Sequence, residues 1–272
     1  MKKVIVPIDF SATSLKALEH AKYLSREFSY EILLLHTISS PTISTHAEIA
    51  IQAENFKKEE EDSNRQLSEL SEQLTAEGFK NSYQTETGFL SDTLHELEKE
   101  MEVAFVVMGT TGASGFLGRL IGSNASAVMQ RIQSPLMLIP HESGAPNFKN
   151  LLFCTQFQTD ETDVLKEVFA FAYHFGSHVD LLKINADWVL EIFSDNSEIE
   201  RIKNTFPDEK FSILIHKADS VIKGLDEYLE QHATQLIVLA VRKKNILERL
   251  LDGSTSRRIV LHSKLPMLIY HH

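Results

Sequence analysis

The stretch KKVIVPIDF at residues 2–10 decides the fold, because its pattern returns as KNLLFCTQF at residues 149–157. Each stretch begins with a basic residue, continues as a short apolar run and closes on a polar residue followed by phenylalanine. Apolar runs of roughly four to eight residues are typical of strands buried in a parallel sheet. The sequence therefore predicts two copies of one unit, each opening on a buried strand.

Three further blocks repeat in the same order, so the duplication extends along the whole chain. They are residues 34–36 with 181–183, residues 107–123 with 238–254, and residues 134–139 with 264–269. The offset is 147 residues in the amino-terminal blocks and 131 residues from Val107 to Val238, so the first copy carries sixteen extra residues. We expect them in a surface loop at residues 39–46, between the second and third strands.

Short β-branched runs alternate with helical patterns in the first copy, as in βαβ units on a parallel sheet. Strands are expected at residues 4–8, 32–37, 79–85, 104–108 and 136–139. Ser11 is the expected N-cap of the first helix. Apolar residues at helical spacing predict the buried stripes of three helices. These are Ala17, Ala21, Leu24 and Phe28; Leu67, Leu70 and Leu74, with an end at Gly78; and Leu90, Leu94, Leu97 and Met101.

Charged residues on these helices predict faces in contact with water. The mixed run at residues 57–62 has the i, i+4 spacing of an exposed helix. The acidic residues of the third helix are also expected in solvent: Asp92, Glu96, Glu98 and Glu100. The predicted fold class is α/β, with two tandem open parallel sheets flanked by helices.

Length and composition are those of an ordinary globular protein with two domains. At 272 residues the chain has room for about two domains of usual size. We expect domains at residues 1–142 and 149–272, joined by a linker at residues 143–148 that contains Gly144 and Pro146. Cys154 is the single cysteine, which excludes an internal disulfide and predicts a buried small hydrophobic residue.

Charge and hydropathy exclude several classes of partner. A net charge of −11 argues against a nucleic-acid partner and against an anionic membrane surface. No run approaches the roughly eighteen apolar residues that a membrane span requires. No cleavable apolar segment follows Met1. The expected location is the cytoplasm.

The segment VMGTTGASGFLGRLIGS at residues 107–123 places glycines between a predicted strand and a predicted helix. Gly109 and Gly112 can adopt positive φ and let a ligand approach the main chain closely. Gly122 and Ser123 open the next helix, whose unpaired N–H groups and positive dipole end attract an anion. Because ligands bind beyond the carboxyl ends of parallel strands, Asp9 after the first strand would face the same crevice. The pattern predicts a cradle for a polyphosphate, with Asp9 accepting hydrogen bonds from ribose hydroxyls.

Three features of the first copy belong together. They are the spacing Gly109-x2-Gly112-x9-Gly122-Ser123, Asp9 after the first strand, and a second strand ending in His36 and Thr37. In this combination the sequence closely resembles the universal stress protein family, in its ATP-binding branch. The resemblance covers nearly the whole chain, as a tandem of two such domains.

The resemblance implies a fold, a ligand and an internal pairing. The fold is a five-stranded parallel α/β sheet of the adenine nucleotide alpha hydrolase-like type. The ligand is ATP, with or without Mg²⁺. The two domains would pair through their last strands, residues 136–139 and 267–269, around a pseudo-twofold axis, and a homodimer of the chain is a further partner that the resemblance leaves open.

The resemblance also implies which residues hold the nucleotide. The phosphates would lie against Gly109, Gly112, Gly122, Ser123 and Asn124. The sugar would lie near Asp9, and the adenine near Pro7, Thr37 and Met108. Taken as residues alone, Pro7, Thr37 and Met108 are strand-end positions that fit packing as well as ligand contact.

The second copy departs from the pattern where the ligand would bind. Asp9 is matched by Gln156, Gly109 by Ala240 and Gly112 by Lys243, whereas Gly253 and Ser254 keep the helix start. If two positions need positive φ, replacing both glycines costs about 1–2 kcal/mol each. We therefore expect a degenerate second site. The basic run at residues 242–244 is expected on the surface rather than in an anion site.

Other chemistries are poorly represented in the sequence. There is no Walker loop, no Cys/His cluster with metal spacing and no general base beside the expected phosphates. We expect a signalling protein that binds ATP rather than an enzyme. Two alternatives stay open: an enzyme that slowly hydrolyses ATP or transfers part of it, in which Arg119 would reach the phosphates, and an interaction module that dimerises without a nucleotide.

Overall fold

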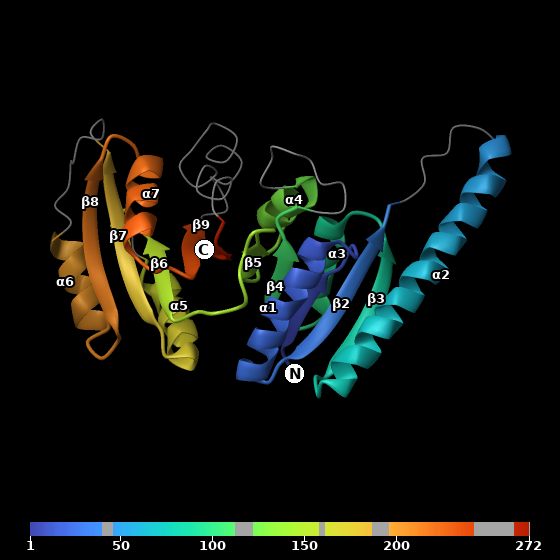
Figure 1. The fold of residues 1–272 in the computed structure, drawn as a ribbon, viewed down its shortest axis with the longest axis horizontal. Helices are drawn as coiled ribbons and strands as arrows, with labels where there is room; N and C mark the ends of the chain where they lie inside the picture. Colours follow the sequence, from blue (N-terminus) through green and yellow to red (C-terminus); the bar gives the residue numbers. More distant parts are fainter. Residues whose placement is uncertain (40–45, 112–121, 158–160, 187–195, 242–263, 272) are drawn as a thin grey trace. The chain divides into compact units, whose positions relative to one another are not determined.

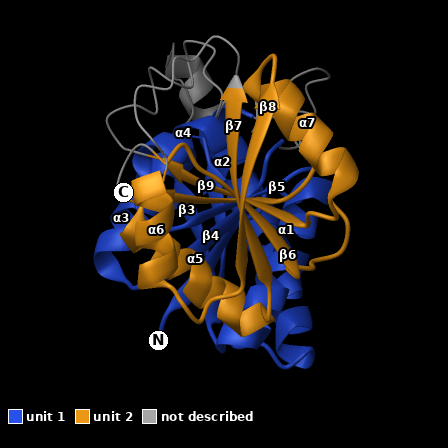
Figure 2. Cartoon of the chain, turned by 90° about the vertical axis from the view of Figure 1, so that its left-hand side faces the viewer, with its two compact units in different colours: residues 1–141 blue, residues 142–272 orange. Residues whose placement is uncertain are grey.

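The protein is described by a computed structural model that covers residues 1–39, 46–111, 122–157, 161–186, 196–241 and 264–271 (Figure 1). It divides into two compact units, Met1–His141 and Glu142–His272 (Figure 2). Both units are α/β, as the sequence predicts. Each is described below by itself.

The first unit alternates strands and helices along the chain. Its elements are β1 (Lys3–Pro7), α1 (Ala12–Phe28), β2 (Glu31–Ile38), α2 (His46–Ala76), β3 (Asn81–Thr87), α3 (Leu90–Glu100), β4 (Val103–Gly109), α4 (Ser123–Arg131) and β5 (Leu136–Ile139). The five strands are parallel in the order β3-β2-β1-β4-β5. Because the order reverses at β1, right-handed crossovers place α1 and α2 on one face and α3 and α4 on the other.

The second unit repeats this topology. Its elements are β6 (Asn150–Cys154), α5 (Thr162–Phe175), β7 (His178–Ala186), α6 (Asn196–Thr205), β8 (Phe211–Ala218), α7 (Val221–Gln231), β9 (Leu236–Val241) and β10 (Met267–His271). The strands are again parallel, in the order β8-β7-β6-β9-β10. Two tandem five-stranded sheets agree with the duplication read from the sequence.

Unusual backbone conformations recur at equivalent positions of the two units. Phe10 follows β1 with φ of 61°, and Phe157 follows β6 with φ of 53°. A bulky residue in the left-handed region is uncommon, so its recurrence at equivalent positions marks a shared turn. Ser29 and Gly176 also correspond, because both are left-handed C-caps of the first helix in their unit.

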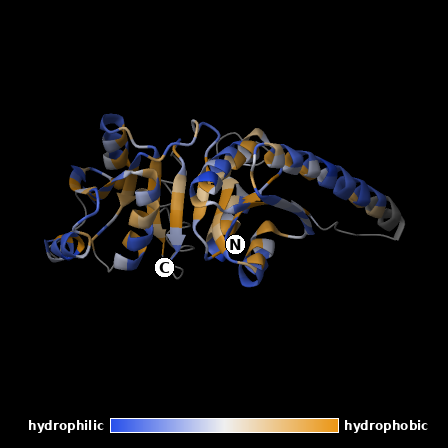
Figure 3. Cartoon of the chain, turned by 90° about the horizontal axis from the view of Figure 1, so that it is seen from below, coloured by the Kyte–Doolittle hydropathy of each residue, from blue (hydrophilic) through white to orange (hydrophobic). Residues whose placement is uncertain are grey.

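The core lies in the central strands of each sheet. Val4, Ile5 and Val6 of β1 have no exposed surface, and neither do Ile237 and Val238 of β9. Figure 3 shows these strands as apolar, in orange, whereas α2 is mostly hydrophilic. Continuous apolar strands of this kind are buried on both faces by helices.

The amino-terminal helix begins where the sequence predicts. Ser11 caps α1, and its side chain accepts a hydrogen bond from the backbone N–H of Ser14 at 3.2 Å. Ala17, Ala21 and Leu24 of the predicted stripe are fully buried. Phe28 is only half-buried, because it lies at the last turn and stacks on Tyr30 at a ring distance of 5.3 Å.

The extra residues of the first copy lie between β2 and β3, where α2 has 31 residues and its counterpart α6 has 10. The loop expected at 39–46 lies almost entirely outside the described residues. The first half of α2 extends past the sheet (Figure 1). An exposed helix rich in charged residues supports such an extension, because i, i+4 pairs such as Lys57–Glu61 stabilise it in water.

The junction between the units contains one core residue. Phe148, within the predicted linker at 143–148, is fully buried and packs on Phe171 and Phe175 of α5 at ring distances of 5.5 and 5.2 Å. The exact domain boundaries stay a prediction. Within the described ranges, we find no helix with the length and apolarity that a membrane crossing needs.

Candidate nucleotide site

A pocket opens at the carboxyl ends of β1, β2 and β4, where the strand order of the first unit reverses. This edge of an open parallel sheet is the usual position of a ligand. Eight of the nine predicted site residues line this pocket: Pro7, Asp9, Thr37, Met108, Gly109, Gly122, Ser123 and Asn124. Gly112, the ninth, and Arg119 lie outside the described residues.

Eight further residues line the pocket without having been predicted. They are Ile8, Ser14, Leu35, His36, Leu90, Thr110, Thr111 and Ala125. Thr110, Thr111 and Ala125 are direct neighbours of predicted residues, so their positions were available from the sequence. Leu90 had no such signal, because its place in an apolar helical stripe predicts core packing.

Asp9 is held at the end of β1 by the start of α1. Its Oδ1 accepts hydrogen bonds from the backbone N–H of Ser11 at 3.1 Å and from Ser11 Oγ at 2.6 Å. Ser11 in turn caps α1, so the carboxylate is fixed by the same turn that begins the helix. The half-buried side chain of Asp9 thus presents a hydrogen-bond acceptor to the pocket.

His36 adds an imidazole from β2. Its Nδ1 lies 2.6 Å from the carbonyl oxygen of Ile8. A carbonyl oxygen only accepts hydrogen bonds, so Nδ1 carries the proton and Nε2 of the neutral ring is an acceptor. The centroid of this ring lies 5.1 Å from that of Phe10, the left-handed residue after β1. Phe10 thus packs against a residue that lines the pocket.

Gly109 is required by packing and not by backbone conformation. The described glycines with positive φ are Gly78, Gly88 and Gly176, so Gly109 does not use the positive φ that glycine allows. A Cβ at position 109 would lie 2.7 Å from Thr13 Cγ2, well inside van der Waals contact. Glycine therefore lets α1 approach β4 closely at the floor of the pocket.

The first turn of α4 forms the opposite wall. Gly122 is its N-cap, and the N–H of Gly122 donates to the carbonyl of Thr110 at 2.6 Å, which fixes the helix start against the end of β4. Helix geometry leaves the N–H groups of Ser123, Asn124 and Ala125 without an intrahelical acceptor. Ser123 and Asn124 are exposed. The helix dipole and these donors together suit an anionic group.

The arrangement combines three chemistries in one pocket. Backbone donors lie at the α4 start, a carboxylate and an imidazole lie at the ends of β1 and β2, and apolar side chains such as Leu35, Leu90 and Met108 lie among them. Such a lining suits a ligand with an anionic tail, hydroxyl groups and a flat apolar part. In the part of the chain that the structure describes, we find no group of three His, Cys, Asp or Glu that could hold a metal ion.

The second unit differs at the corresponding strand end. Thr155, which follows β6, donates from Oγ1 to Glu161 Oε2 at 2.5 Å, and only 8% of Glu161 is exposed. Lys183, which corresponds to His36, is also buried. Seven residues join β6 to α5, whereas four join β1 to α1. The strand end that corresponds to the Asp9 and His36 edge therefore carries a buried carboxylate and a buried ammonium group.

The thiol of Cys154 is unreactive at neutral pH. Part of the residue is exposed, but burial of its thiol, with the nearby Glu161 charge, raises the thiol pKa to about 12. The thiol is therefore protonated at neutral pH and is a poor nucleophile. This agrees with the prediction of a small hydrophobic residue.

Comparison with known proteins decides the family. The model of the universal stress protein family matches residues 1–140 and again residues 147–271. The chain belongs to the universal stress protein family. Each unit thus carries one copy of the family's domain, as the resemblance of the sequence implied.

Individual relatives agree with this membership. Universal stress protein MJ0531 of Methanocaldococcus jannaschii is 27% identical over 141 residues, which are 51% of this chain and 81% of that protein. Universal stress protein YxiE of Bacillus subtilis is 27% identical over 154 residues, covering 50% of this chain and 97% of the relative. A crystal structure of a universal stress protein from Archaeoglobus fulgidus superposes with a TM-score of 0.80 at 18% identity, over 99% of this chain and 98% of that one. This last likeness shows the tandem fold.

Proposed function

We propose that the first unit binds an adenine nucleotide, in the first place ATP, and that the protein acts in a stress response through this ligand-dependent state. The observation that carries the proposal is the pocket at the carboxyl ends of β1, β2 and β4, with the amino end of α4 on one side and Asp9 on the other. The universal stress protein family assignment supports the biological setting.

The phosphates of the nucleotide would lie at the start of α4. The backbone N–H groups of Ser123 and Asn124, with the Ser123 hydroxyl, supply the donors there, and the exposure of both residues leaves them accessible. Charge-assisted hydrogen bonds of this kind contribute roughly 1.5–3 kcal/mol each. Three or four of them suffice for micromolar affinity, which corresponds to about −8 kcal/mol.

The ribose and the base would lie toward the strand ends. Asp9 is fixed by Ser11, so it accepts hydrogen bonds from ribose hydroxyls without further ordering of its side chain. Pro7, Thr37 and Met108 line the pocket and would contact the adenine. A bound Mg²⁺ would be coordinated mainly by the phosphates and water, as Mg²⁺ usually is at nucleotides.

The second unit is proposed to support the first without binding a nucleotide. Its strand end carries the buried Glu161 carboxylate, and Gln156 and Ala240 replace Asp9 and Gly109. The side chain and the glycine that the first unit offers to a nucleotide at these positions are therefore not repeated here. The proposal therefore gives one nucleotide per chain.

The nucleotide that remains bound through native purification tests the proposal. We expect mass spectrometry of the denatured protein to find an adenine nucleotide at about one per chain, and Asp9→Ala to lose it. Gln156→Ala, the matched change in the second unit, should retain it. A preparation that neither carries nor takes up a nucleotide, yet binds its protein partners, would favour the interaction module. Turnover of ATP with Mg²⁺ at a useful rate would favour the enzyme.

A further inference from the structure

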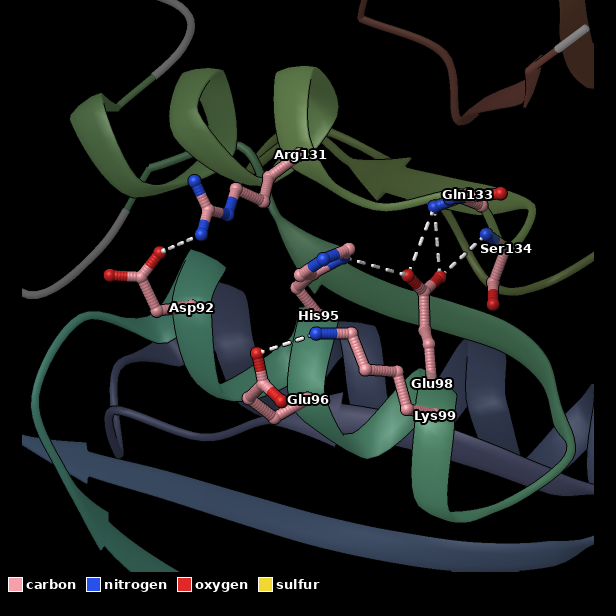
Figure 4. Close-up of polar contacts among 8 residues, drawn as sticks. All are labelled: Asp92, His95, Glu96, Glu98, Lys99, Arg131, Gln133 and Ser134. Carbon is pink, nitrogen blue, oxygen red and sulfur yellow. Dashed lines mark hydrogen bonds and ion pairs between the residues drawn. The ribbon is translucent and has the colours of Figure 1, made fainter.

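Glu98 of α3 is not a solvated residue, although the sequence predicts one. Its side chain is 10% exposed. Its carboxylate accepts hydrogen bonds from the backbone N–H of Gln133, at 2.9 and 3.1 Å to its two oxygens, and from the backbone N–H of Ser134 at 2.6 Å. Figure 4 shows the carboxylate facing both N–H groups, in the segment that leaves α4. One side chain of α3 thus satisfies the donors just after the end of α4.

A second contact ties the same two helices together. Arg131 in the last turn of α4 lies 3.1 Å from Asp92 in the first turn of α3 (Figure 4). His95 lies between these two contacts, with Nδ1 3.9 Å from Glu98 Oε2. By contrast, the hydrogen-bonded ion pair of Glu96 is with Lys99, at 2.8 Å and within α3. Helix α3 therefore holds the carboxyl end of α4 through Asp92 and Glu98.

The amino end of α4 is the part that lines the pocket. The helix has nine residues and is about 13 Å long, so backbone hydrogen bonds connect its two ends over little more than two turns. Its buried side chains are Ala125, Val128 and Met129, which are small or flexible anchors. A rotation or slide at the carboxyl end is passed on to Ser123 and Asn124. Of the polar contacts at that end, those of Glu98 are charge-assisted and nearly buried, and so the strongest.

We propose that Glu98 is a positioning residue for nucleotide binding: by fixing the segment after α4, it sets the position of the α4 N–H groups that receive the phosphates. The inference rests on the proposed function of the first unit. It assigns Glu98 no contact with the ligand. Removing its contacts should therefore weaken the binding of the phosphates and leave the binding of the nucleoside unchanged.

The test compares ATP with adenosine on two matched variants of the full chain. Glu98→Gln keeps the shape of the side chain, removes its charge and places an amide donor against backbone N–H groups. Glu96→Gln removes the same charge two residues away, on a side chain whose ion pair is with Lys99. We expect Glu98→Gln to weaken ATP binding by about tenfold, the loss of roughly one charge-assisted bond, with adenosine affinity within twofold of wild type. Glu96→Gln should leave both affinities unchanged.

Binding is measured at a temperature where circular dichroism shows that both variants are folded. Under that condition each outcome supports or overturns the positioning role of Glu98. If wild type binds ATP and Glu98→Gln binds it equally well, the positioning role is wrong and the proposed function stands. Equal losses for ATP and adenosine would show a general loosening of the unit, which also overturns the inference. Absence of ATP binding by wild type removes both proposals. Should Glu98→Gln not fold, Glu98→Asp keeps the charge but is one methylene too short to reach both N–H groups, and is judged in the same way.

Discussion

Gly109 leaves no room for a side chain, because Thr13 of α1 occupies the space beside it. We expect Gly109→Ala to lower the free energy of unfolding by about 1–3 kcal/mol, the usual cost of overpacking. Adding Thr13→Ser removes the methyl group at 2.7 Å and should recover part of the loss in urea unfolding. Gly144→Ala is the control, because nothing lies within 4 Å of its added Cβ. Equal stability of Gly109→Ala and wild type would contradict this steric reading.

Ser29 caps α1 in a left-handed conformation with φ of 56°. An L-residue pays about 1–2 kcal/mol for that conformation, whereas glycine does not. The second unit places Gly176 at the equivalent cap of α5. We therefore expect Ser29→Gly to raise the free energy of unfolding by about 0.5–1 kcal/mol, the gain being reduced by the greater chain entropy of glycine. A thermal melt with a lower midpoint than wild type would contradict this expectation.

Glu31 gives the first unit a pH-dependent contribution to stability. The hydrogen bond from Lys3 at 2.8 Å, helped by one from Ser82, lowers the pKa of the Glu31 carboxyl in the folded state. A lowered folded pKa adds stability above the unfolded pKa, and that stability is lost as the pH falls through the folded value. Glu31→Gln should therefore cost about 1 kcal/mol at pH 7 and almost nothing below the folded pKa. A loss that is the same at both pH values in urea titrations would argue against the ion pair.

Single residues also show where prediction from sequence stops. Asp9, Gly122 and Ser123 were predictable because strand ends and helix starts fix their position whatever packs around them. Glu98 was not, because its partners at residues 133 and 134 are backbone groups 35 and 36 positions away that carry no sequence signal. The packing requirement at Gly109 was also hidden, since the crowding by Thr13 is a tertiary contact.

At the scale of elements, α2 divides into a packed half and an exposed half. Leu67 is fully buried against the sheet, and Asn64 and Ser71 form hydrogen bonds to Thr85 and Asn81 of β3. Glu60, one turn or so before this packed half, is exposed. We expect Leu67→Ala to cost about 2–5 kcal/mol, the range for a buried leucine. Glu60→Ala should change the free energy of unfolding by less than about 0.5 kcal/mol, as measured by urea titration.

The strands and most helices followed from the sequence, and α2 shows why its extension did not. The predicted stripe Leu67, Leu70 and Leu74 covers only the half that meets the sheet. Upstream of it the apolar periodicity is weak, and only the charged run at residues 57–62 indicated an exposed helix. Helix propensity and charge pairs extend α2 beyond its packed half, and neither leaves a buried face to detect.

At the scale of the whole molecule, two units of equal topology differ in the chemistry of one strand end. The first presents Asp9 and His36, and the second presents Thr155, Glu161 and Lys183. We expect calorimetric titration with ATP to give one site per chain. Glu161→Gln removes the buried carboxylate but restores neither Asp9 nor Gly109, so it should leave that number at one. A second site in wild type would contradict the proposed loss of binding in the second unit.

A crystal structure of the full chain grown with saturating ATP and Mg²⁺ tests the proposed function most directly. We predict density for one nucleotide in the first unit, with its phosphates within hydrogen-bond distance of the N–H groups of Ser123 and Asn124 and its ribose at Asp9. An empty pocket at the carboxyl ends of β1, β2 and β4, or a nucleotide bound only in the second unit, would contradict it.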